Sequence, residues 1–222
     1  MRLLMIQTAG AEGSVALGDA DAAQTIVATE MLPGRTSSER LVPAVRRLMA
    51  ASGWKLSELA AVVVVHGPGS FTGVRVGVSA AKGLSEAGSV PLIAVSRLAL
   101  LAGSVGDVGQ AVHAVLDAGR GEFYYGEYVG RSCVREVLMS AQDVIVAASD
   151  ALVVVCETRV AESLAELRPR LVEEPSAGDA LPFAVERVAS GEFDDAATLD
   201  ANYLRRTDAE IFAKPALPRP AR

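Results

Sequence analysis

The residues that could most readily do chemistry stand together in one glycine-rich segment, G-P-G-S-F-T-G-V-R-V-G, at positions 67–77. It connects a β-branched run at 62–65, typical of a strand buried on both faces, to an expected helix. Glycine permits positive φ and close approach of a second backbone, and the free N–H groups at a helix start favour an anion. The segment therefore predicts a site for a phosphate group or for a partner protein.

Familiar catalytic loops do not match this segment. A phosphate-binding P-loop needs a lysine after its last glycine, where Val74 stands, and a nucleophile elbow needs glycines two positions before and after the serine, which Ser70 lacks. His66 and His113 are the only histidines, and a structural position at a strand end is the simpler role for each. A closed metal site usually takes about four ligands. We therefore expect neither a nucleophilic serine nor a metal bound by this chain alone.

The composition favours a globular protein with a sizeable core, because half of its 222 residues are apolar. Two isolated cysteines suit a reducing compartment, and we expect a cytoplasmic protein. Acidic side chains number 27 against 21 basic ones, so the net charge of −6 gives no general attraction for a nucleic acid. Cys133 and Cys156 lack metal or redox spacing and are expected as small buried side chains. The apolar start at 3–6 is too short for a secretory peptide, and polar residues interrupt the apolar stretch 134–156, so we expect no membrane segment.

Around the glycine-rich segment the hydrophobic pattern predicts an α/β arrangement. Three strands are followed by a helix capped by Ser37 or Ser38, then a strand, a second helix after Gly69 and a further strand. The expected strands are 3–6, 14–17, 25–30, 62–65 and 92–95. This order predicts a mixed sheet with helices packed against it.

The second half of the chain starts again with the same pattern. A strand at 112–116, a turn through Gly119 and Gly121, and a strand at 122–128 repeat the strand, polar residue and glycine turn that open the chain. Two such units face each other in the two-lobed actin-like ATPase fold of sugar kinases, heat-shock proteins and actin, where the paired turns hold nucleotide phosphates. Any two strand–turn–strand units also look alike, so the repeat by itself leaves both interpretations open.

The expected domain organisation follows from this repeat. An N-terminal lobe at 1–105 carries the glycine-rich loop, and a second, degenerate lobe at 106–214 includes a closing helix beyond Leu181. Residues 215–222 are expected to form a solvated, proline-rich tail.

One face of the helix after the loop is expected to be smooth. Gly73, Gly77 and Ala81 fall at i, i+4 and i+8, and small residues at this spacing let another helix approach closely. The apolar stripe with Leu41 and Val45 on the earlier helix is a candidate for the facing surface. The contact could lie within this chain or between two chains, and the sequence leaves the two open.

Residues 67–77 resemble the G-P-G-S-F-T-G-[LV]-R-[IV]-G signature of the TsaB (YeaZ) family, paralogues of the TsaD tRNA threonylcarbamoyltransferase. Three further segments are similar to family motifs in the same order: S-E-R-L-V-P at 38–43, L-D-A-G-R-G-E-F-Y at 116–124 and Y-L-R at 203–205. The resemblance extends along the chain except for a looser stretch between Arg131 and Asp179.

The resemblance implies the two-lobed fold, no catalytic residue in this chain, and cooperation with TsaD and the ATPase TsaE in transferring threonylcarbamoyl to the adenosine beside the tRNA anticodon. It implies ATP or ADP and magnesium in the complex, none held tightly by this chain alone, with tRNA engaged through the complex. Family members pair with TsaD through the helices of the N-lobe, and a homodimer through the same surface would compete with that heterodimer.

Two sets of site residues follow from the resemblance and the loop. The expected dimer interface comprises Ser38, Glu39, Leu41, Val45, Gly73, Val74, Gly77 and Ala81. The candidates for nucleotide or partner contacts in the loops are Gln7, Thr8, Gly67, Pro68, Gly69, Ser70, Phe71, Thr72, Gly73, Arg75, Asp117 and Arg120.

Two positions depart from the family pattern. Gln7 stands where the family usually has aspartate, and an amide is a poor ligand for magnesium, which argues against independent ATP turnover. Ser37 stands where the family usually has histidine, which leaves any partner contact of that histidine in doubt.

Two other functions remain as alternatives. An ATP-dependent kinase or transferase of the same fold would use Asp117 as its metal-side carboxylate. A peptidase is the weakest candidate, since neither a catalytic triad nor a metal cluster can be assembled from the residues present.

Overall fold

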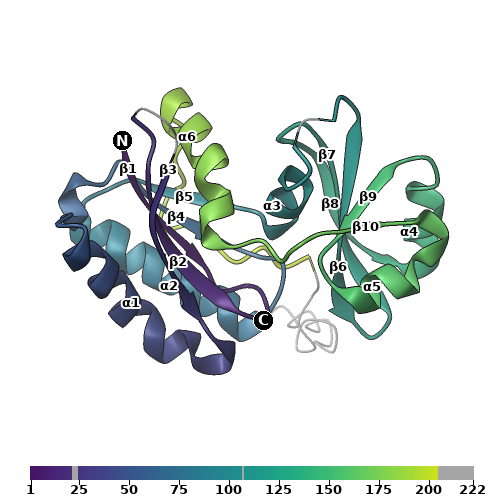
Figure 1. The fold of residues 1–222 in the computed structure, drawn as a ribbon, viewed down its shortest axis with the longest axis horizontal. Helices are drawn as coiled ribbons and strands as arrows, with labels where there is room; N and C mark the ends of the chain where they lie inside the picture. The colour runs from purple at the N-terminus through teal and green to yellow at the C-terminus, as the bar shows by residue number, and fades with distance from the viewer. Residues whose placement is uncertain (22–24, 107, 205–222) are drawn as a thin grey trace, which may run out of the picture.

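A computed structural model describes residues 1–21, 25–106 and 108–204, and shows two lobes, each built on a mixed five-stranded sheet (Figure 1). The strands of the first sheet are β1 (Arg2–Gln7), β2 (Gly13–Asp19), β3 (Thr25–Leu32), β4 (Ala61–Val65) and β5 (Leu92–Val95). The strands of the second are β6 (Ala111–Gly119), β7 (Glu122–Val129), β8 (Ser132–Ser140), β9 (Leu152–Val155) and β10 (Arg170–Leu171). The α-helices are α1 (Ser37–Ala51), α2 (Phe71–Gly88), α3 (Arg97–Gly103), α4 (Ala141–Ala147), α5 (Thr158–Ser163) and α6 (Leu181–Ser190).

The predicted duplication of the two lobes is confirmed by the topology. The first sheet has the order β3-β2-β1-β4-β5 and the second the order β8-β7-β6-β9-β10. In each, the first three strands form an antiparallel meander, and the last two run parallel to the first. The two hairpins β1–β2 and β6–β7 therefore occupy equivalent places in the lobes, as the glycine turns predict.

One helix from each half of the chain packs on the sheet of the other half, which the sequence-based boundaries did not anticipate. We call these two, α3 and α6, the exchanged helices. Helix α3 follows β5 of the first sheet but packs on β6, β7 and β9 of the second. Helix α6 follows the second sheet but packs on β1, β4 and β5 of the first (Figure 1). The assignment of the closing helix to the second lobe is thus wrong, because its buried Leu181 and Ala184 belong to the core of the first.

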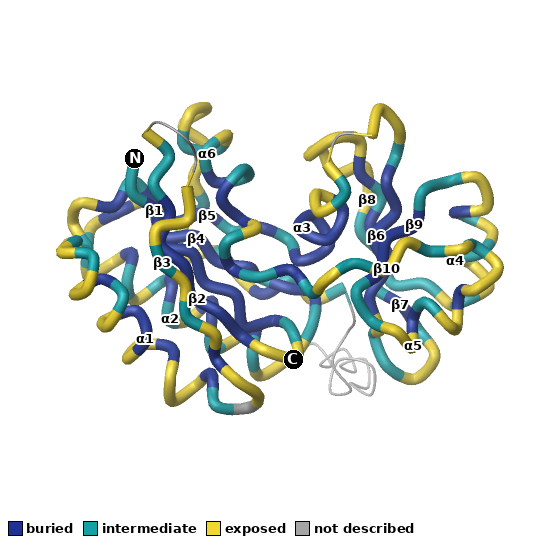
Figure 2. The backbone as a smooth tube through the Cα atoms, in the orientation of Figure 1, coloured by how far each residue is buried: buried dark blue, intermediate teal, exposed yellow. Residues whose placement is uncertain are grey.

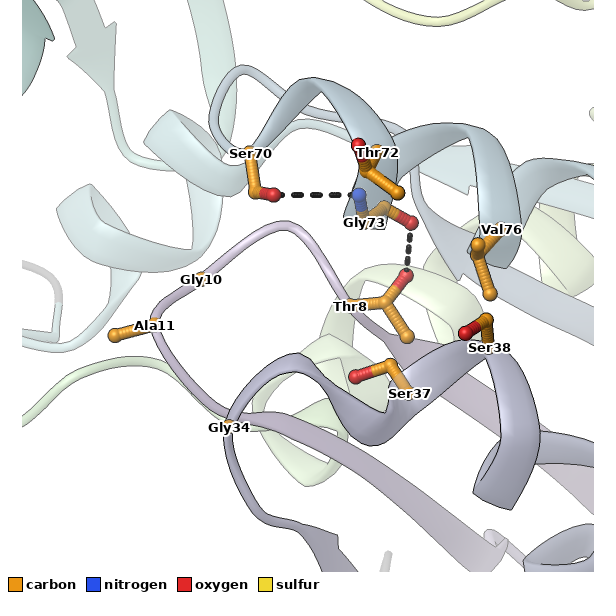
Figure 3. A pocket seen from close by; sticks show the side chains of 10 residues that line it. All are labelled: Thr8, Gly10, Ala11, Gly34, Ser37, Ser38, Ser70, Thr72, Gly73 and Val76. Carbon is orange, nitrogen blue, oxygen red and sulfur yellow. Dashed lines mark hydrogen bonds between the residues drawn. The ribbon is translucent and has the colours of Figure 1, made fainter.

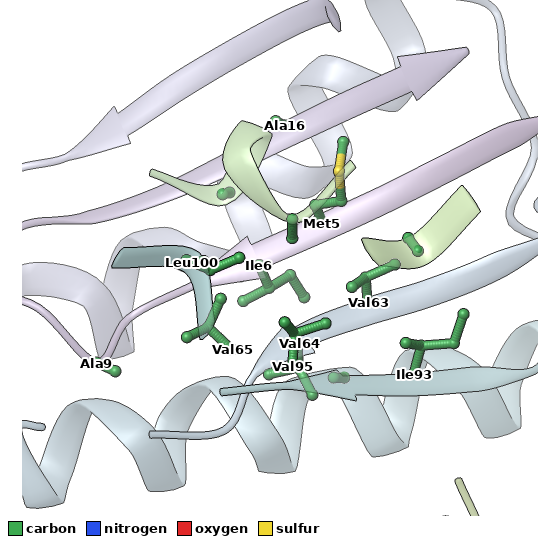
Figure 4. Packing of buried hydrophobic residues seen from close by; sticks show 14 of the residues in the cluster. Met5, Ile6, Ala9, Ala16, Val63, Val64, Val65, Ile93, Val95 and Leu100 are labelled. Carbon is green, nitrogen blue, oxygen red and sulfur yellow. The ribbon is translucent and has the colours of Figure 1, made fainter. Parts of the chain in front are cut away.

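Helices α1 and α2 cover the outer face of the first sheet, and α4 and α5 cover the outer face of the second. The exchanged helices lie between the sheets and join the cores of both lobes. Strand β4 is completely buried, as its β-branched run predicts, and packs among side chains such as Met5, Ile6 and Ile93 (Figure 4). The same cluster continues into the second lobe through Leu116 and Tyr128.

Several local expectations need correction. Helix α1 begins at Ser37, directly after the 3-10 turn η1 (Gly34–Thr36), and its N-cap position is Thr36 rather than a serine. Cys133 is exposed on β8, while Cys156 is half-buried, so only one of the two thiols is packed. The hydrophobic pattern also missed the elements from β8 to β10. The proposed tail at 215–222 lies outside the described residues, and in the part that is described no helix has the length and apolar character needed to span a membrane.

Candidate functional site

The first candidate site is a pocket of about 390 Å³ where the hairpin β1–β2, the glycine-rich loop and the starts of α1 and α2 meet (Figure 3). It is lined by Thr8, Gly10, Ala11, Gly34, Ser37, Ser38, Ser70, Thr72, Gly73 and Val76. Five of its side chains carry hydroxyl groups, which gives it a polar, uncharged lining. The structure therefore brings together residues that the sequence places on separate motifs.

Backbone hydrogen bonds to the hairpin β1–β2 and to the start of helix α3 hold the glycine-rich loop in place. Gly67 and Gly69 have φ values of 110° and 154°, which side chains rarely allow. The Ser70 N–H donates to the carbonyl of Ala9 at 2.8 Å, and the Gly67 carbonyl accepts from the N–H of Arg97 at 2.7 Å. The Ser70 hydroxyl then caps α2 by accepting from the N–H of Gly73. Because Gly67 and Pro68 are buried, they support the loop and do not offer a binding surface.

The smooth face predicted for α2 turns inward. A Cβ at Gly73 would overlap the carbonyl oxygen of Thr8, and one at Gly77 would overlap the Thr8 hydroxyl. Ala81 is fully buried in the first-lobe core. The small residues therefore let α2 approach strand β1 of its own sheet, and the intramolecular alternative is the correct one.

This finding corrects most of the expected interface. Gly77, Ala81, Leu41, Val45 and Val74 are all buried within the chain and cannot form a partner surface in this fold. Ser38 and Glu39 are exposed, so only these two members of the predicted set lie clearly on an open surface.

A different face of the same two helices is open. It comprises Ser38, Glu39 and Val42 of α1 and Thr72, Val76, Ser79 and Gly83 of α2, and we call it the α1–α2 outer face. The side of α1 turned away from the sheet is exposed (Figure 2). A Cβ at Gly83 would meet nothing within 4 Å, and Val42 keeps 47% of its surface exposed. Thr72 and Val76 of this face directly precede Gly73 and Gly77 in the sequence, so the open face and the predicted stripe lie on different sides of α2.

Two loop candidates, Phe71 and Arg75, form a cluster with Tyr203, near the end of the described residues. The Arg75 guanidinium lies 3.7 Å from the ring centroid of Phe71, and its Nε donates to the Tyr203 hydroxyl at 2.7 Å. Phe71 and Tyr203 lie 5.9 Å apart between ring centroids. Both rings are partly exposed, so the cluster sits at the surface. Arg205, the last residue of the Y-L-R motif, lies outside the described residues.

A second pocket of about 510 Å³ lies between the two hairpins. Asp117 of hairpin β6–β7 lines it with Gly69, Ser70 and two arginines, Arg97 and Arg159. The Asp117 carboxylate accepts the N–H of Gly119 at 2.7 Å and so belongs to its own turn. The remaining loop candidate, Arg120, is exposed in the same turn and has a φ of 59°.

A buried arginine, Arg97, and a partly exposed carboxylate, Glu157, line this second pocket. The Asp117 N–H donates to the Glu157 carboxylate at 2.8 Å. Burial raises the pKa of Glu157, while that N–H and Arg97 act in the opposite direction. Arg97 is only 4% exposed, and its Nη2 lies 2.7 Å from Glu174 and 3.7 Å from Glu157.

The hairpin β1–β2 is held by the segment that returns from the second lobe. Gln7, which is 1% exposed, donates from Nε2 to the carbonyl of Pro175 at 2.9 Å and accepts the N–H of Gly10. The N–H of Ala11 donates to Glu174 at 2.9 Å. Gln7 is therefore a structural residue of this turn, and the turn's exposed N–H already has a carboxylate partner.

Sequence reasoning missed Arg97, Glu157 and Glu174. Each of the first two stands two residues after a strand, β5 for Arg97 and β9 for Glu157. Polar residues at the carboxyl ends of parallel strands commonly line ligand crevices, so that signal was available. Glu174 lies in an irregular segment before a proline, where no pattern marks it. Among the described residues, no group of three or more histidine, cysteine, aspartate or glutamate side chains has a metal-binding arrangement.

Comparisons with known proteins agree with this geometry. The family model described as TsaD, tRNA N6-adenosine threonylcarbamoyltransferase, matches residues 31–153. The structure of YeaZ from Pseudomonas aeruginosa superposes with a TM-score of 0.75 at 30% identity, covering 91% of this chain and 99% of that one. The chain belongs to the TsaB (YeaZ) family. The family resemblance expected from residues 67–77 is thereby confirmed.

Curated members of the TsaB family are similar over shorter spans. The tRNA threonylcarbamoyladenosine biosynthesis protein TsaB of Escherichia coli is 38% identical over 58% of this chain and 55% of its own length. TsaB of Bacillus subtilis is 35% identical over 51% of this chain and 49% of its own length. The chain spans about half the length of the curated relatives it matches.

More distant structures bear on the fold alone. The activator of 2-hydroxyisocaproyl-CoA dehydratase from Clostridium difficile, with bound ADPNP, covers 88% of the chain with a TM-score of 0.50 at 11% identity. Together with the YeaZ structures and the duplicated sheets, this likeness confirms the predicted two-lobed actin-like ATPase fold.

Proposed function

We propose that the chain is a subunit of the complex that synthesises N6-threonylcarbamoyladenosine on tRNA, and that it binds and activates a TsaD-type transferase without catalysing the transfer. The observation that carries this proposal is its likeness to YeaZ over nearly the whole described fold, with the G-P-G-S-F-T-G loop at the junction of hairpin and helices. Relatives are named for biosynthesis of this modification, which supports a role in the same pathway.

Several contacts support a non-catalytic role. Gln7 offers an amide where a metal-binding carboxylate would be needed, and both ends of that amide are already used: Oε1 accepts from Gly10 of the hairpin, and Nε2 donates to the carbonyl of Pro175. Asp117 is engaged by the N–H of its own turn. On this proposal TsaD supplies the catalytic groups, ATP or ADP and magnesium act with TsaD and TsaE, and tRNA is engaged through the complex in the cytoplasm.

The α1–α2 outer face is the docking surface in this proposal. It is open, it combines small residues with the apolar Val42 and Val76, and it adjoins the hydroxyl-lined pocket through Ser38 and Thr72. An exposed glycine at position 83 lets a partner helix approach the backbone of α2 closely. A homodimer through the same face would be isologous and would compete with the TsaD heterodimer.

Reconstitution tests the proposal. TsaD and TsaE of the same organism, tRNA, ATP, threonine and bicarbonate, with the enzyme that makes threonylcarbamoyl-adenylate, should yield the modified adenosine only when this chain is added. Full modification by the other proteins without it would contradict the proposal. The alternative ATP-dependent enzyme predicts nucleotide hydrolysis by the isolated chain that Asp117→Asn abolishes. Proteolysis by the isolated chain would favour the peptidase.

A further inference from the structure

One backbone N–H in the turn of hairpin β1–β2 binds a carboxylate. Consecutive residues Ala9, Gly10 and Ala11 form its tip, and the N–H of Ala11 points at a carboxylate oxygen, Oε1 of Glu174, at 2.9 Å. That same oxygen lies so close to Gly10 that a Cβ there would overlap it. Backbone N–H groups of a glycine turn commonly bind phosphate or carboxylate oxygens in this way.

A buried cation faces the same oxygen. Nη2 of Arg97 donates to Oε1 of Glu174 at 2.7 Å, and only 4% of the surface of Arg97 is exposed. Among the described residues, the Nε of Arg97 is a buried side-chain nitrogen without a hydrogen-bond partner. A single carboxylate oxygen therefore leaves part of the guanidinium's donor capacity unused, whereas an oxyanion with three or more oxygens could satisfy more of it.

The geometry points to an anion site that the chain fills itself. The turn 9–11 and Arg97 bind the Glu174 carboxylate where an external phosphate group would otherwise bind. Glu174 thereby blocks the binding of phosphate to this hairpin. Glu174 is delivered by the segment that leads from β10 back to the first lobe. That segment is fixed on both sides of it, by Val172 donating to the carbonyl of Val155 and by Pro175 accepting from Gln7.

The neighbouring charges set how strongly a freed site would bind phosphate. Arg159 lines the same pocket, while Glu157 stands 3.7 Å from Nη2 of Arg97 and would repel an anion. Removing the charge of Glu157 as well as that of Glu174 should therefore strengthen phosphate binding further. This anion site does not depend on whether the chain pairs with TsaD.

The test is phosphate binding by the full chain, measured as a phosphate-dependent rise in Tm and by titration of the Ala11 amide resonance. Glu174→Ala should bind inorganic phosphate at least about tenfold more tightly than the wild type, with a shift of the Ala11 amide. Glu173→Ala is the matched control, since it removes an adjacent exposed charge, and it should behave like the wild type. The double variant Glu174→Ala/Glu157→Gln should bind more tightly still.

Further variants and ligands allow the inference to be tested even if Glu174→Ala does not fold on its own. If Glu174→Ala folds only in the presence of phosphate, the inference is supported, and Glu174→Gln, which keeps the shape of the side chain, should show an intermediate affinity. ADP and pyrophosphate in place of phosphate distinguish a nucleotide from a free oxyanion. Equal phosphate binding by the wild type, Glu173→Ala and Glu174→Ala, or no binding by folded Glu174→Ala and Glu174→Gln, would overturn the inference.

Discussion

The hydroxyl of Thr8 donates a hydrogen bond of 2.7 Å to the carbonyl oxygen of Gly73, where the end of β1 meets the first turn of α2. One turn further along, the same hydroxyl takes the space that a Cβ at Gly77 would need. Thr8 thereby fixes the rotation of α2 on the sheet. The rotation decides which stripe of the helix is buried and which remains open to a partner.

The first prediction concerns this contact. Gly77→Ala should lower the free energy of unfolding by about 1–3 kcal/mol through overpacking, and Thr8→Ala by about 1 kcal/mol through the lost hydrogen bond. In the double variant the missing hydroxyl makes room for the new methyl group. The double variant should therefore lose less free energy of unfolding than the sum of the losses in the two single variants. Urea denaturation of the four proteins measures the coupling. Strict additivity would show that Thr8 is not what excludes a side chain at Gly77.

The open side of α2 predicts the opposite effect of the same change. Gly83→Ala should raise the free energy of unfolding by about 0.5–1 kcal/mol, because alanine is the better helix former and its Cβ meets no neighbour. Thermal and urea denaturation of the isolated chain measure it. A loss of stability would mean that position 83 is covered within the chain.

The sequence alone predicted the fold more accurately than the surfaces available for binding a partner. The apolar run at 62–65 and the glycine turns each specify a local structure that needs no distant partner, and both are present. The stripe of Gly73, Gly77 and Ala81 was correctly identified as a close-contact face, but the two glycines meet Thr8, the residue that follows β1 in the same chain. Helical spacing cannot say whether a smooth face meets the chain's own sheet or another molecule.

Long-range contacts explain the other misses. Helix α6 lies on the first lobe because Leu181 and Ala184 complete a core more than a hundred residues earlier in the chain, which periodicity does not encode. Glu174 reaches the first hairpin in the same way. The family motifs did identify the loop and both hairpins, since those motifs are contiguous in the sequence.

The third prediction concerns the surface cluster of Phe71, Arg75 and Tyr203. Arg75→Ala should lower the free energy of unfolding by about 1 kcal/mol, because it removes both the cation–π contact and the hydrogen bond to the tyrosine. Tyr203→Phe removes only the hydrogen bond and should cost less. Urea denaturation compares the two variants. A larger loss for Tyr203→Phe than for Arg75→Ala would contradict this account of the cluster.

The fourth prediction concerns pH. His113 is 5% exposed and lies 2.6 Å by its Nδ1 from the Tyr125 hydroxyl, and burial lowers its pKa. Because the unfolded chain then binds the proton more readily, stability should fall as pH drops below about 6.5, by at most about 1.4 kcal/mol per pH unit from this group. His113→Gln should reduce that slope in urea denaturation between about pH 5 and pH 7. An unchanged slope would assign the pH dependence to other groups.

The most direct test of the central claim is the affinity for TsaD of a chain with a bulky charge on the α1–α2 outer face. Gly83→Arg should keep the fold and weaken TsaD binding by about a hundredfold or more, while Ala189→Arg, on the exposed side of α6, should bind like the wild type. Loss of tRNA modification should accompany the loss of binding. Equal affinity of folded Gly83→Arg and Ala189→Arg for TsaD would contradict the account.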